Sequence, residues 1–284
     1  MMQQAHDVVA PGRVAVVTGA ASGIGFALSR RFATEGMRVV MADVEATALV
    51  EAAEDLTRRG ATILRVATDV SKGEQVDALR DKALDAFGAV HLLCNNAGVG
   101  GSPHPVWELP YDDWEWVLGV NLWGVINGIR SFVPVLLEQD AAYVINTASL
   151  AGVTTGTLGA YGVSKHGVVA LSESLYVELQ MRGARVGVSV LCPGWVRTRI
   201  ADSDRNRPAE AEPQLEPHPA AQPILDMVRQ RVERGMDPGQ VADQAVDAVR
   251  SSRFYVLTHP EMNDAIRRRA DEVVSGGPPS IPTL

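Results

Sequence analysis

A glycine-rich segment between a strand-like run and a helical pattern constrains this chain more than any other feature. Residues 13–18 (RVAVVT) predict a strand, and residues 23–36 predict a helix. The sequence TGAASGIG at 18–25 joins them, and its glycines permit a tight turn and a close approach of the backbone to a pyrophosphate at the helix N-terminus. A glycine-rich turn without a ligand is the alternative, but the strand, loop and helix together favour a phosphate-binding loop.

The alternation of strand and helix patterns continues along most of the chain. Further strands are predicted at 37–42, 61–67, 89–94, 142–147, 185–191 and 253–257, and helices at 45–59, 72–87, 111–138, 159–182, 238–251 and 260–274. The strands are continuously apolar, which is typical of a parallel sheet covered on both faces. We therefore expect an α/β fold, a single-domain, Rossmann-type, doubly wound parallel sheet of about seven strands flanked by helices.

One segment near the C-terminal end breaks the alternation. Residues 199–236 include a stretch rich in proline, alanine and charge, ADSDRNRPAEAEPQLEPHPAAQP. A long irregular segment in a compact domain is usually a lid or a loop that moves, so we expect a substrate lid here. The tail at 275–284 is rich in glycine and proline and is predicted to be irregular. Residues 1–284 are expected to form one domain.

Charge and cysteine content disfavour several classes of function. Asp and Glu outnumber Lys and Arg by 34 to 26, a formal net charge of −8, which is a poor match for nucleic acid or an anionic membrane surface. The sequence contains no run of about 18 apolar residues, so no membrane span is predicted. Its N-terminus has no basic segment followed by an apolar core, so no signal peptide is predicted. Both cysteines, Cys94 and Cys192, lie in apolar stretches, which fits a reducing compartment, so a cytoplasmic protein is expected.

The acidic residue that ends the second predicted strand indicates which dinucleotide is bound. Asp43 follows Gly25 by 18 positions, where a carboxylate accepts hydrogen bonds from the adenosine ribose hydroxyls and repels the 2′-phosphate of NADP. No Arg or Lys follows it immediately, and Ser22 in the loop is uncharged. NAD is therefore the expected cofactor. Asp43 is also placed to cap the following helix, and the two roles are compatible.

A tyrosine, a lysine and a serine are spaced for proton transfer. Tyr161 and Lys165 are four residues apart on one predicted helix and share a face. Ser149 follows a predicted strand, at the edge where open α/β sheets bind ligands. A nearby cation favours an ionised phenol, so we expect Lys165 to lower the pKa of Tyr161 and make it a general base or acid. Ser149 would stabilise charge on the substrate oxygen.

Together these segments resemble the classical short-chain dehydrogenases/reductases. The resemblance rests on TGAASGIG, on Asn95-Asn96-Ala97-Gly98 (NNAG), on Ser149 and on YGVSK at 161–165. It covers about residues 12–200 strongly and 237–258 weakly, and it implies hydride transfer between a nicotinamide and a secondary alcohol or ketone. It also implies that Lys165 binds the nicotinamide ribose and that Asn121 holds a water in a proton relay.

The resemblance assigns the cofactor contacts and the catalytic residues. Asp69-Val70 matches the segment that holds the adenine, and residues 193–198 (PGWVRT) match the segment that closes over the nicotinamide carboxamide. The residues expected to bind the cofactor are Gly19, Ser22, Gly23, Ile24, Gly25, Asp43, Asp69, Val70, Asn95, Ala97, Gly98, Tyr161, Lys165, Pro193, Gly194, Val196 and Thr198. The residues expected to be catalytic are Asn121, Ser149, Tyr161 and Lys165.

The expected substrate pocket is mostly apolar. Ser149 and Tyr161 are 12 positions apart, one fewer than is usual in the family, and the shortened loop between them lines the pocket in the family. The pocket residues implied by the resemblance are Ala151, Thr154, Thr155, Leu158 and Trp195. We therefore expect an apolar or aromatic secondary alcohol or ketone as the substrate.

Other functions stay open at this point. The protein could bind NAD as a non-enzymatic sensor or scaffold, or it could be an NADP-dependent ketone reductase. The six histidines show no metal-ligand spacing, so no metal is expected. The resemblance implies a homotetramer or homodimer, paired through the helices at 111–138 and 159–182. A small molecule is the expected partner, with neither nucleic acid nor a membrane.

Overall fold

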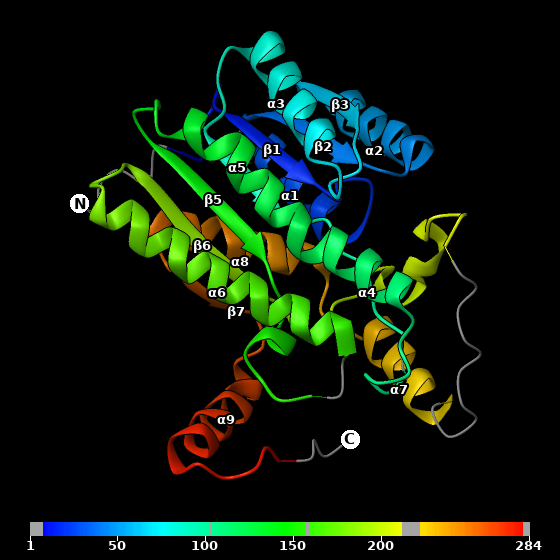
Figure 1. The fold of residues 1–284 in the computed structure, drawn as a ribbon. Coiled ribbons are helices and arrows are strands. Elements are labelled where there is room, and N and C mark those ends of the chain that lie inside the picture. Colours follow the sequence, from blue (N-terminus) through cyan, green and yellow to red (C-terminus); the bar gives the residue numbers. More distant parts are fainter. Residues whose placement is uncertain (1–7, 103, 157–158, 212–221, 281–284) are drawn as a thin grey trace.

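A single parallel sheet forms the centre of the molecule (Figure 1). The computed structural model describes residues 8–102, 104–156, 159–211 and 222–280. The seven strands are β1 (Val14–Thr18), β2 (Arg38–Asp43), β3 (Ile63–Ala67), β4 (Leu92–Asn95), β5 (Ala142–Thr147), β6 (Val186–Cys192) and β7 (Tyr255–Leu257). Their order across the sheet is β3-β2-β1-β4-β5-β6-β7, and every neighbouring pair is parallel.

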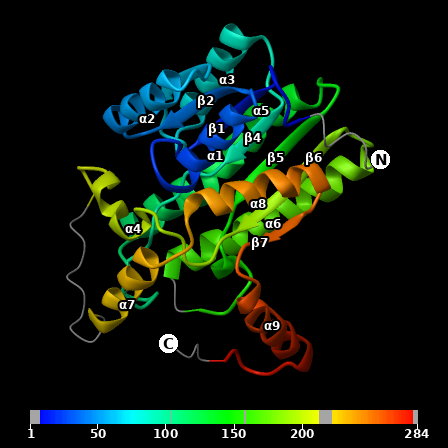
Figure 2. The same ribbon diagram turned by 180° about the vertical axis from the view of Figure 1, so that it is seen from behind.

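Helices cover both faces of this sheet. The helices are α1 (Gly23–Thr34), α2 (Ala46–Arg58), α3 (Gly73–Phe87), α4 (Tyr111–Leu118), α5 (Gly124–Leu136), α6 (Gly159–Met181), α7 (Gln222–Glu233), α8 (Pro238–Ser251) and α9 (Asn263–Ser275). Side chains of α3, α5 and α6 pack in the core of one face, and those of α1, α2 and α8 pack in the core of the other (Figures 1 and 2). The expected fold class, a doubly wound Rossmann-type sheet, is therefore confirmed.

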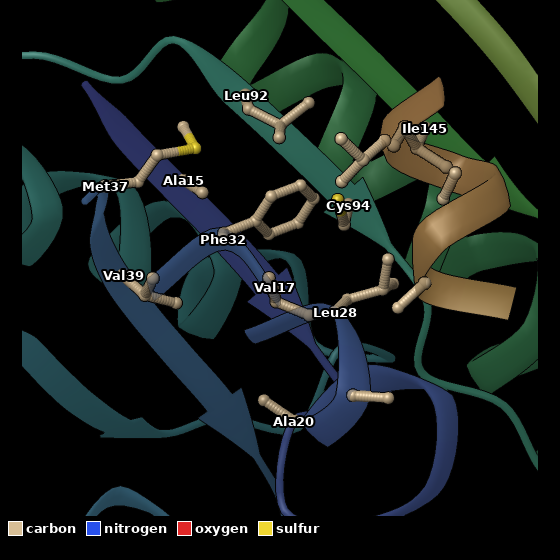
Figure 3. Packing of buried hydrophobic residues seen from close by; sticks show 14 of the residues in the cluster. Ala15, Val17, Ala20, Leu28, Phe32, Met37, Val39, Leu92, Cys94 and Ile145 are labelled. Carbon is tan, nitrogen blue, oxygen red and sulfur yellow. The ribbon is translucent and has the colours of Figure 1, made fainter. Parts of the chain in front are cut away.

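The strands read as continuously apolar because both of their faces are buried. In β1, Ala15 and Val17 face the core beneath α1, whereas Val14 and Val16 face the opposite core. Figure 3 shows Phe32 of α1 packed over β1 and its neighbour β4. Residues that alternate along a strand point to opposite sides of the sheet, so burial of both sides requires apolar residues at every position.

The sheet topology determines where a ligand can bind. Strand β1 lies between β2 and β4, so the chain leaves β1 toward one side of the sheet and later returns to its other side. Parallel strands all end at the same edge, and the crevice beyond this edge at such a switch point is the usual ligand site of open α/β sheets. The loops after β1, β2, β4, β5 and β6 meet at this edge.

Two expected elements differ in the structure. The helix predicted at 111–138 is divided into α4 and α5 by a π-helical turn, Gly119–Trp123. The segment at 199–236 is not irregular throughout, because it contains a 3-10 helix, Ile200–Asn206, and the helix α7. Its residues 212–221 lie outside the described part of the chain.

The C-terminal part ends in a helix that lies apart from the sheet. Helix α9 extends to Ser275, and no residue of it is buried, in keeping with its separate position in both ribbon views (Figures 1 and 2). The described part of the tail, residues 276–280, is neither helix nor strand. Within the described ranges, no helix combines the length and the apolar character needed to cross a membrane.

Candidate active site

The glycine loop after β1 forms a cradle that only glycine permits. Gly19 and Gly23 have positive φ angles of 65° and 54°, in the left-handed region. A Cβ atom on Gly25 would lie 2.0 Å from the carbonyl oxygen of Gly19, so no larger residue fits there. Ser22 precedes α1 but makes no side-chain cap, and the first amides of α1, including that of Ile24, have no acceptor within the helix. The loop therefore fits a pyrophosphate.

Three polar residues that the sequence analysis missed hold this cradle in place. The hydroxyl of Thr18 accepts hydrogen bonds from the amides of Asn96, at 2.9 Å, and Ala97, at 3.1 Å. The Asn96 side chain donates to the carbonyl oxygen of Thr18 at 3.0 Å, and Thr147 donates to Asn96 Oδ1 at 3.3 Å. The loops after β1, β4 and β5 are thus joined. Thr18 begins the glycine segment and Asn96 is the second residue of NNAG, so both lay within motifs already identified.

Asn95 lies at the same edge, but its side chain points into the core. Its Nδ2 donates to Oδ1 of Asn146 at 2.9 Å, and Asn146 in turn donates to the hydroxyl of Ser172 at 3.0 Å. A Cβ atom on Gly128 of α5 would lie 2.0 Å from Asn95 Oδ1, so α5 packs directly against this amide. The structure therefore does not bring the Asn95 side chain to the glycine loop. It connects β4 to β5 and α6.

Asp43 connects the end of β2 to the glycine loop. Its carboxylate accepts hydrogen bonds from the amides of Ala21, at 2.9 Å, and Glu45, at 3.0 Å. Burial raises the pKa of Asp43, and the backbone hydrogen bonds act in the opposite direction. The N-cap of α2 is Glu45, so Asp43 braces the turn before α2 without being its N-cap residue.

The next turn along the edge contains Asp69 and Val70. Asp69 accepts hydrogen bonds from the amide of Ser71 at 2.9 Å and from its hydroxyl at 2.7 Å. Val70 is buried, and its carbonyl oxygen accepts from Asn127 of α5 at 2.9 Å. The amide of Thr68 donates to the carbonyl oxygen of Asp43 at 2.9 Å, so this turn lies beside the end of β2.

Ser149 and Tyr161 face each other across the edge of the sheet. The Ser149 hydroxyl donates to the carbonyl oxygen of Pro193 at 3.3 Å and accepts from the amide of Ala151 at 3.1 Å. Tyr161 lies in the first turn of α6. Burial raises the pKa of Tyr161, and the hydrogen bond with Ser149 offsets only part of this effect.

Lys165 lies one turn further along α6 and is buried. Its Nζ donates to the carbonyl oxygen of Thr147 at 3.1 Å and lies 5.6 Å from the ring centre of Tyr161. Burial lowers the pKa of Lys165 to about 8. From the sequence, Lys165 is expected to lower the pKa of Tyr161, but in the structure burial of the phenol dominates and its pKa is raised.

Asn121 lies in the π-helical turn between α4 and α5, and its side chain is fully engaged. Its Oδ1 accepts from the amide of Val99 at 2.8 Å, while its Nδ2 donates to the Val99 carbonyl oxygen at 3.0 Å and to Ser164 Oγ at 3.1 Å. A Cβ atom on Gly98 would lie 3.4 Å from Asn121 Oδ1 and 3.5 Å from Lys165 Nζ. Asn121 therefore fixes the loop after β4 against α6, with Gly98 beside Lys165.

The segment after β6 returns over the glycine loop. The amide of Gly194 donates to Nδ1 of His259 at 3.1 Å, and Nε2 of the same ring lies 3.1 Å from the carbonyl oxygen of Trp195. Val196 forms a parallel bridge with Met236. At Gly23, a Cβ atom would lie 3.1 Å from the methyl group of Thr198, so the two segments are in contact.

The expected substrate residues fall into two groups. Ala151, Thr154 and Thr155 follow Ser149 directly, but the Thr154 hydroxyl donates to the Leu150 carbonyl oxygen at 2.8 Å. Trp195 lines a different space, a hollow of about 540 Å³ that none of the four expected catalytic residues lines. This hollow is lined by Trp195, Gln230, Arg231, Arg234, Gly235, Met236, Gln240, His259 and Glu261. Leu158 lies outside the described residues.

The part of the chain that the structure describes contains no group of three or more His, Cys, Asp or Glu side chains placed to hold a metal ion. The polar groups at the sheet edge are the first amides of α1, the Asp43 carboxylate and the side chains of Ser149, Tyr161 and Lys165. A Rossmann sheet with such an edge is typical of dinucleotide-binding proteins.

One known protein family matches most of this chain. The model of the short chain dehydrogenase family matches residues 13–209, a span that contains the glycine loop, Ser149, Tyr161 and Lys165. The chain therefore belongs to the classical short-chain dehydrogenase/reductase family of oxidoreductases.

Individual relatives match almost the whole chain. A 1-deoxy-11-beta-hydroxypentalenate dehydrogenase from Streptomyces exfoliatus is 39% identical over 274 residues, covering 94% of this chain and 92% of the relative. A CLA biosynthesis dehydrogenase/reductase from Lactiplantibacillus plantarum is 32% identical over 274 residues, covering 95% and 96%. The crystal structure of a short chain dehydrogenase/reductase from Burkholderia phymatum in complex with NAD is 42% identical, with a TM-score of 0.93 and coverage of 96% and 98%.

Proposed function

We propose that this protein is an NAD-dependent dehydrogenase that transfers hydride between the nicotinamide and an apolar or aromatic secondary alcohol or ketone. The observation that carries the proposal is the arrangement of Ser149, Tyr161 and Lys165 at one edge of the sheet, beside a glycine cradle. A binding protein without catalysis has no need of a buried lysine one helical turn from a buried phenol. Burial of the lysine lowers its pKa to about 8, which is a cost to folding.

The residues at the sheet edge fit NAD. The first amides of α1 and the open glycine loop would hold the pyrophosphate, and the Asp43 carboxylate would accept from the adenosine ribose hydroxyls. The negative charge of Asp43 would repel a 2′-phosphate, which favours NAD over NADP. The NAD complex of the Burkholderia relative supports the same preference.

Bound nicotinamide supplies the hydride acceptor for alcohol oxidation and the hydride donor for ketone reduction. In oxidation, Tyr161 takes the hydroxyl proton of the substrate as general base, and in reduction it returns this proton as general acid. Ser149 turns its hydroxyl from the Pro193 carbonyl oxygen to the substrate oxygen and stabilises the charge that develops there. Lys165 in its charged form stabilises the Tyr161 phenolate, which offsets the effect of burial on the phenol.

The surroundings of this site suggest the substrate and the assembly. Ala151 and Thr155 would line the approach to Ser149, and the described parts of the segment at 199–236 would cover it as a lid. The Streptomyces relative is named as a dehydrogenase of a hydroxylated compound, which supports an alcohol substrate. Helix α6 exposes Val163 and Val177, which would pair copies of the chain into a homotetramer or homodimer in the cytoplasm.

The test is the absorbance of reduced nicotinamide during incubation with NAD or NADP and a panel of secondary alcohols. We expect an NAD-dependent signal that falls by about 10²–10⁴ in Tyr161→Phe. The control is Tyr176→Phe on the same helix. The ring of Tyr176 packs against that of Phe254, with 5.1 Å between the ring centres, and removal of its hydroxyl group should leave the rate unchanged. NAD binding without turnover of any alcohol would favour a sensor or scaffold, and a signal with NADP alone would favour an NADP-dependent ketone reductase.

A further inference from the structure

An ion pair between distant segments lies beside the expected ribose site. Glu45 follows Asp43 by two residues, and its amide donates to the Asp43 carboxylate at 3.0 Å. The Glu45 carboxylate accepts from Arg205 Nη2 at 2.6 Å and from Nε of the same side chain at 3.1 Å. Arg199 Nη1 also approaches Glu45, at 3.8 Å, and Asn206 donates to it at 3.1 Å.

Arg205 is held in place by more than this pair. Its Nη1 donates to the carbonyl oxygens of Asp202, at 2.6 Å, and Arg199, at 3.2 Å. The side chains of Arg205 and Glu45 are each 21% exposed, so both groups are partly shielded from water. A guanidinium fixed at both ends loses less conformational entropy on meeting an anion than a free surface arginine does.

The segment that carries Arg205 is fastened across the same edge of the sheet. The hydroxyl of Ser203 accepts from the amide of Gly100 at 2.7 Å, and Arg207 forms an ion pair with Asp113 of α4. Residues 200–207 therefore reach from the end of β2 to the loop after β4 and to α4. Arg205 cannot leave the ribose side of the site without breaking these contacts.

The chemistry of NADP makes this placement important. A 2′-phosphate on the adenosine ribose is typically recognised by an arginine at the end of β2, whereas an acidic residue there selects NAD. In this chain the arginines come from a segment about 160 residues away. Arg205 is already bound to Glu45, and Arg199 is bound to Asp202 at 2.9 Å. The Glu45 carboxylate is close enough to Asp43 to raise its pKa, so both carboxylates act on the same region.

We infer that Glu45 is a second specificity-determining residue for the dinucleotide, which excludes NADP by occupying Arg205. Asp43 supplies repulsion, and Glu45 withholds the cation that would otherwise attract the phosphate. The inference rests on the proposed function. A purely structural role for Glu45, as a fastening for the segment at 200–207, is the competing explanation.

Direct binding of the reduced dinucleotides distinguishes these explanations. Dissociation constants for NADH and NADPH are measured from the quenching of protein tryptophan fluorescence. Glu45→Gln should tighten NADPH at least tenfold and leave NADH within about threefold, because Arg205 is then free for the phosphate. The double variant Glu45→Gln/Arg205→Gln should lose this gain. Glu51→Gln, an exposed position on α2, is the control and should change neither constant.

A second variant tests the inference without relying on Glu45→Gln. Arg205→Gln alone leaves the Glu45 charge beside the ribose with only Arg199, at 3.8 Å, to offset it, so NADPH should bind several-fold more weakly while NADH is unchanged. Equal weakening of NADH and NADPH in both single variants would show a structural fastening and overturn the inference. A gain for NADPH that survives the loss of Arg205 would also overturn it. If the wild-type chain binds neither dinucleotide, the proposed function fails together with the inference.

Discussion

The side-chain amide of Asn121 pairs with both polar groups of the Val99 backbone, accepting from its amide at 2.8 Å and donating to its carbonyl oxygen at 3.0 Å. A third bond, to Ser164, places the same side chain against the turn of α6 that precedes Lys165. The π-helical turn at Gly119–Trp123 turns Asn121 toward these partners, and such turns are frequent at functional sites.

Asn121→Leu should destabilise the protein by about 2–4 kcal/mol, because two buried backbone groups of Val99 lose their partners. Urea unfolding measures the loss. Asn121→Asp retains the acceptor for the Val99 amide and should recover part of the stability. Asn127→Leu removes one bond to a backbone carbonyl from a half-buried position and should cost about 1 kcal/mol. An Asn121→Leu protein as stable as wild type would contradict the role assigned to this side chain.

Lys165 should make the stability of the protein depend on pH. Its pKa falls from 10.5 to about 8 on folding, so the unfolded chain binds more protons between these values and stability rises with pH across this window. The cost at neutral pH is about 3 kcal/mol. Lys165→Met should abolish turnover and remove this rise of stability with pH. It should also stabilise the protein near pH 7, and the lost hydrogen bond to Thr147 should reduce this gain by about 1 kcal/mol.

Urea unfolding at pH 7.5 and pH 9.5 measures this effect. The difference in stability between wild type and Lys165→Met should shrink at the higher pH. Lys82→Met, at an exposed position on α3, is the matched control. If the stabilities of wild type and Lys165→Met change with pH by the same amount, burial does not lower the pKa of Lys165 and this prediction is wrong.

Breaking the ion pair between Asp113 and Arg207 should destabilise the protein far more than breaking an ion pair on the surface. The two side chains are 3% and 10% exposed, and Arg207 also lies over the ring of Trp116. Asp113→Asn should cost about 3 kcal/mol, because it replaces a carboxylate that is 3% exposed with a neutral amide beside the buried guanidinium. Asp264→Asn removes an ion pair whose members are 87% and 74% exposed, and should cost less than about 1 kcal/mol. Equal thermal shifts in the two variants would contradict this ranking.

His259 should position the segment that follows β6. The Gly194 amide can only donate, so Nδ1 of His259 accepts this hydrogen bond and Nε2 donates to the Trp195 carbonyl oxygen. His259→Leu removes these two contacts and a third, with the Thr258 hydroxyl at 2.7 Å. It should lower kcat about tenfold and raise KM for NAD, with a smaller effect on KM for the alcohol. His259→Asn, which keeps an acceptor near the position of Nδ1, should recover more of kcat than His259→Leu does. Equal losses in the two variants would indicate a general packing role.

The sheet was predictable because its burial on two faces forces an apolar residue at nearly every strand position. Each of the seven predicted strands coincides with an observed strand, shifted by up to three residues at the ends. The π-helical turn was not predictable, because Gly119–Trp123 continues the helical pattern of its neighbours and differs only in hydrogen bonding. Helix α7 was missed because it follows a proline-rich stretch and carries many charges.

The site was predictable where one residue type is required at one spacing. Gly25 admits no side chain, and Tyr161 and Lys165 share a helix face, so local sequence indicates all three. Partners from distant segments leave no such local signal. No Arg or Lys follows Asp43 immediately in the sequence, whereas the structure brings Arg205 beside Glu45 from far along the chain.

The central position of β1 has a consequence for folding during synthesis on the ribosome. Strand β1 pairs with β2, which follows it closely, and with β4, which follows roughly 80 residues later and takes seconds to emerge at typical synthesis rates. Until then one edge of the β-branched run VAVVT stays open to pairing with another nascent chain. The strand that leads into the glycine loop is therefore also exposed to aggregation during translation, and slower growth at low temperature with chaperones present should raise the soluble yield.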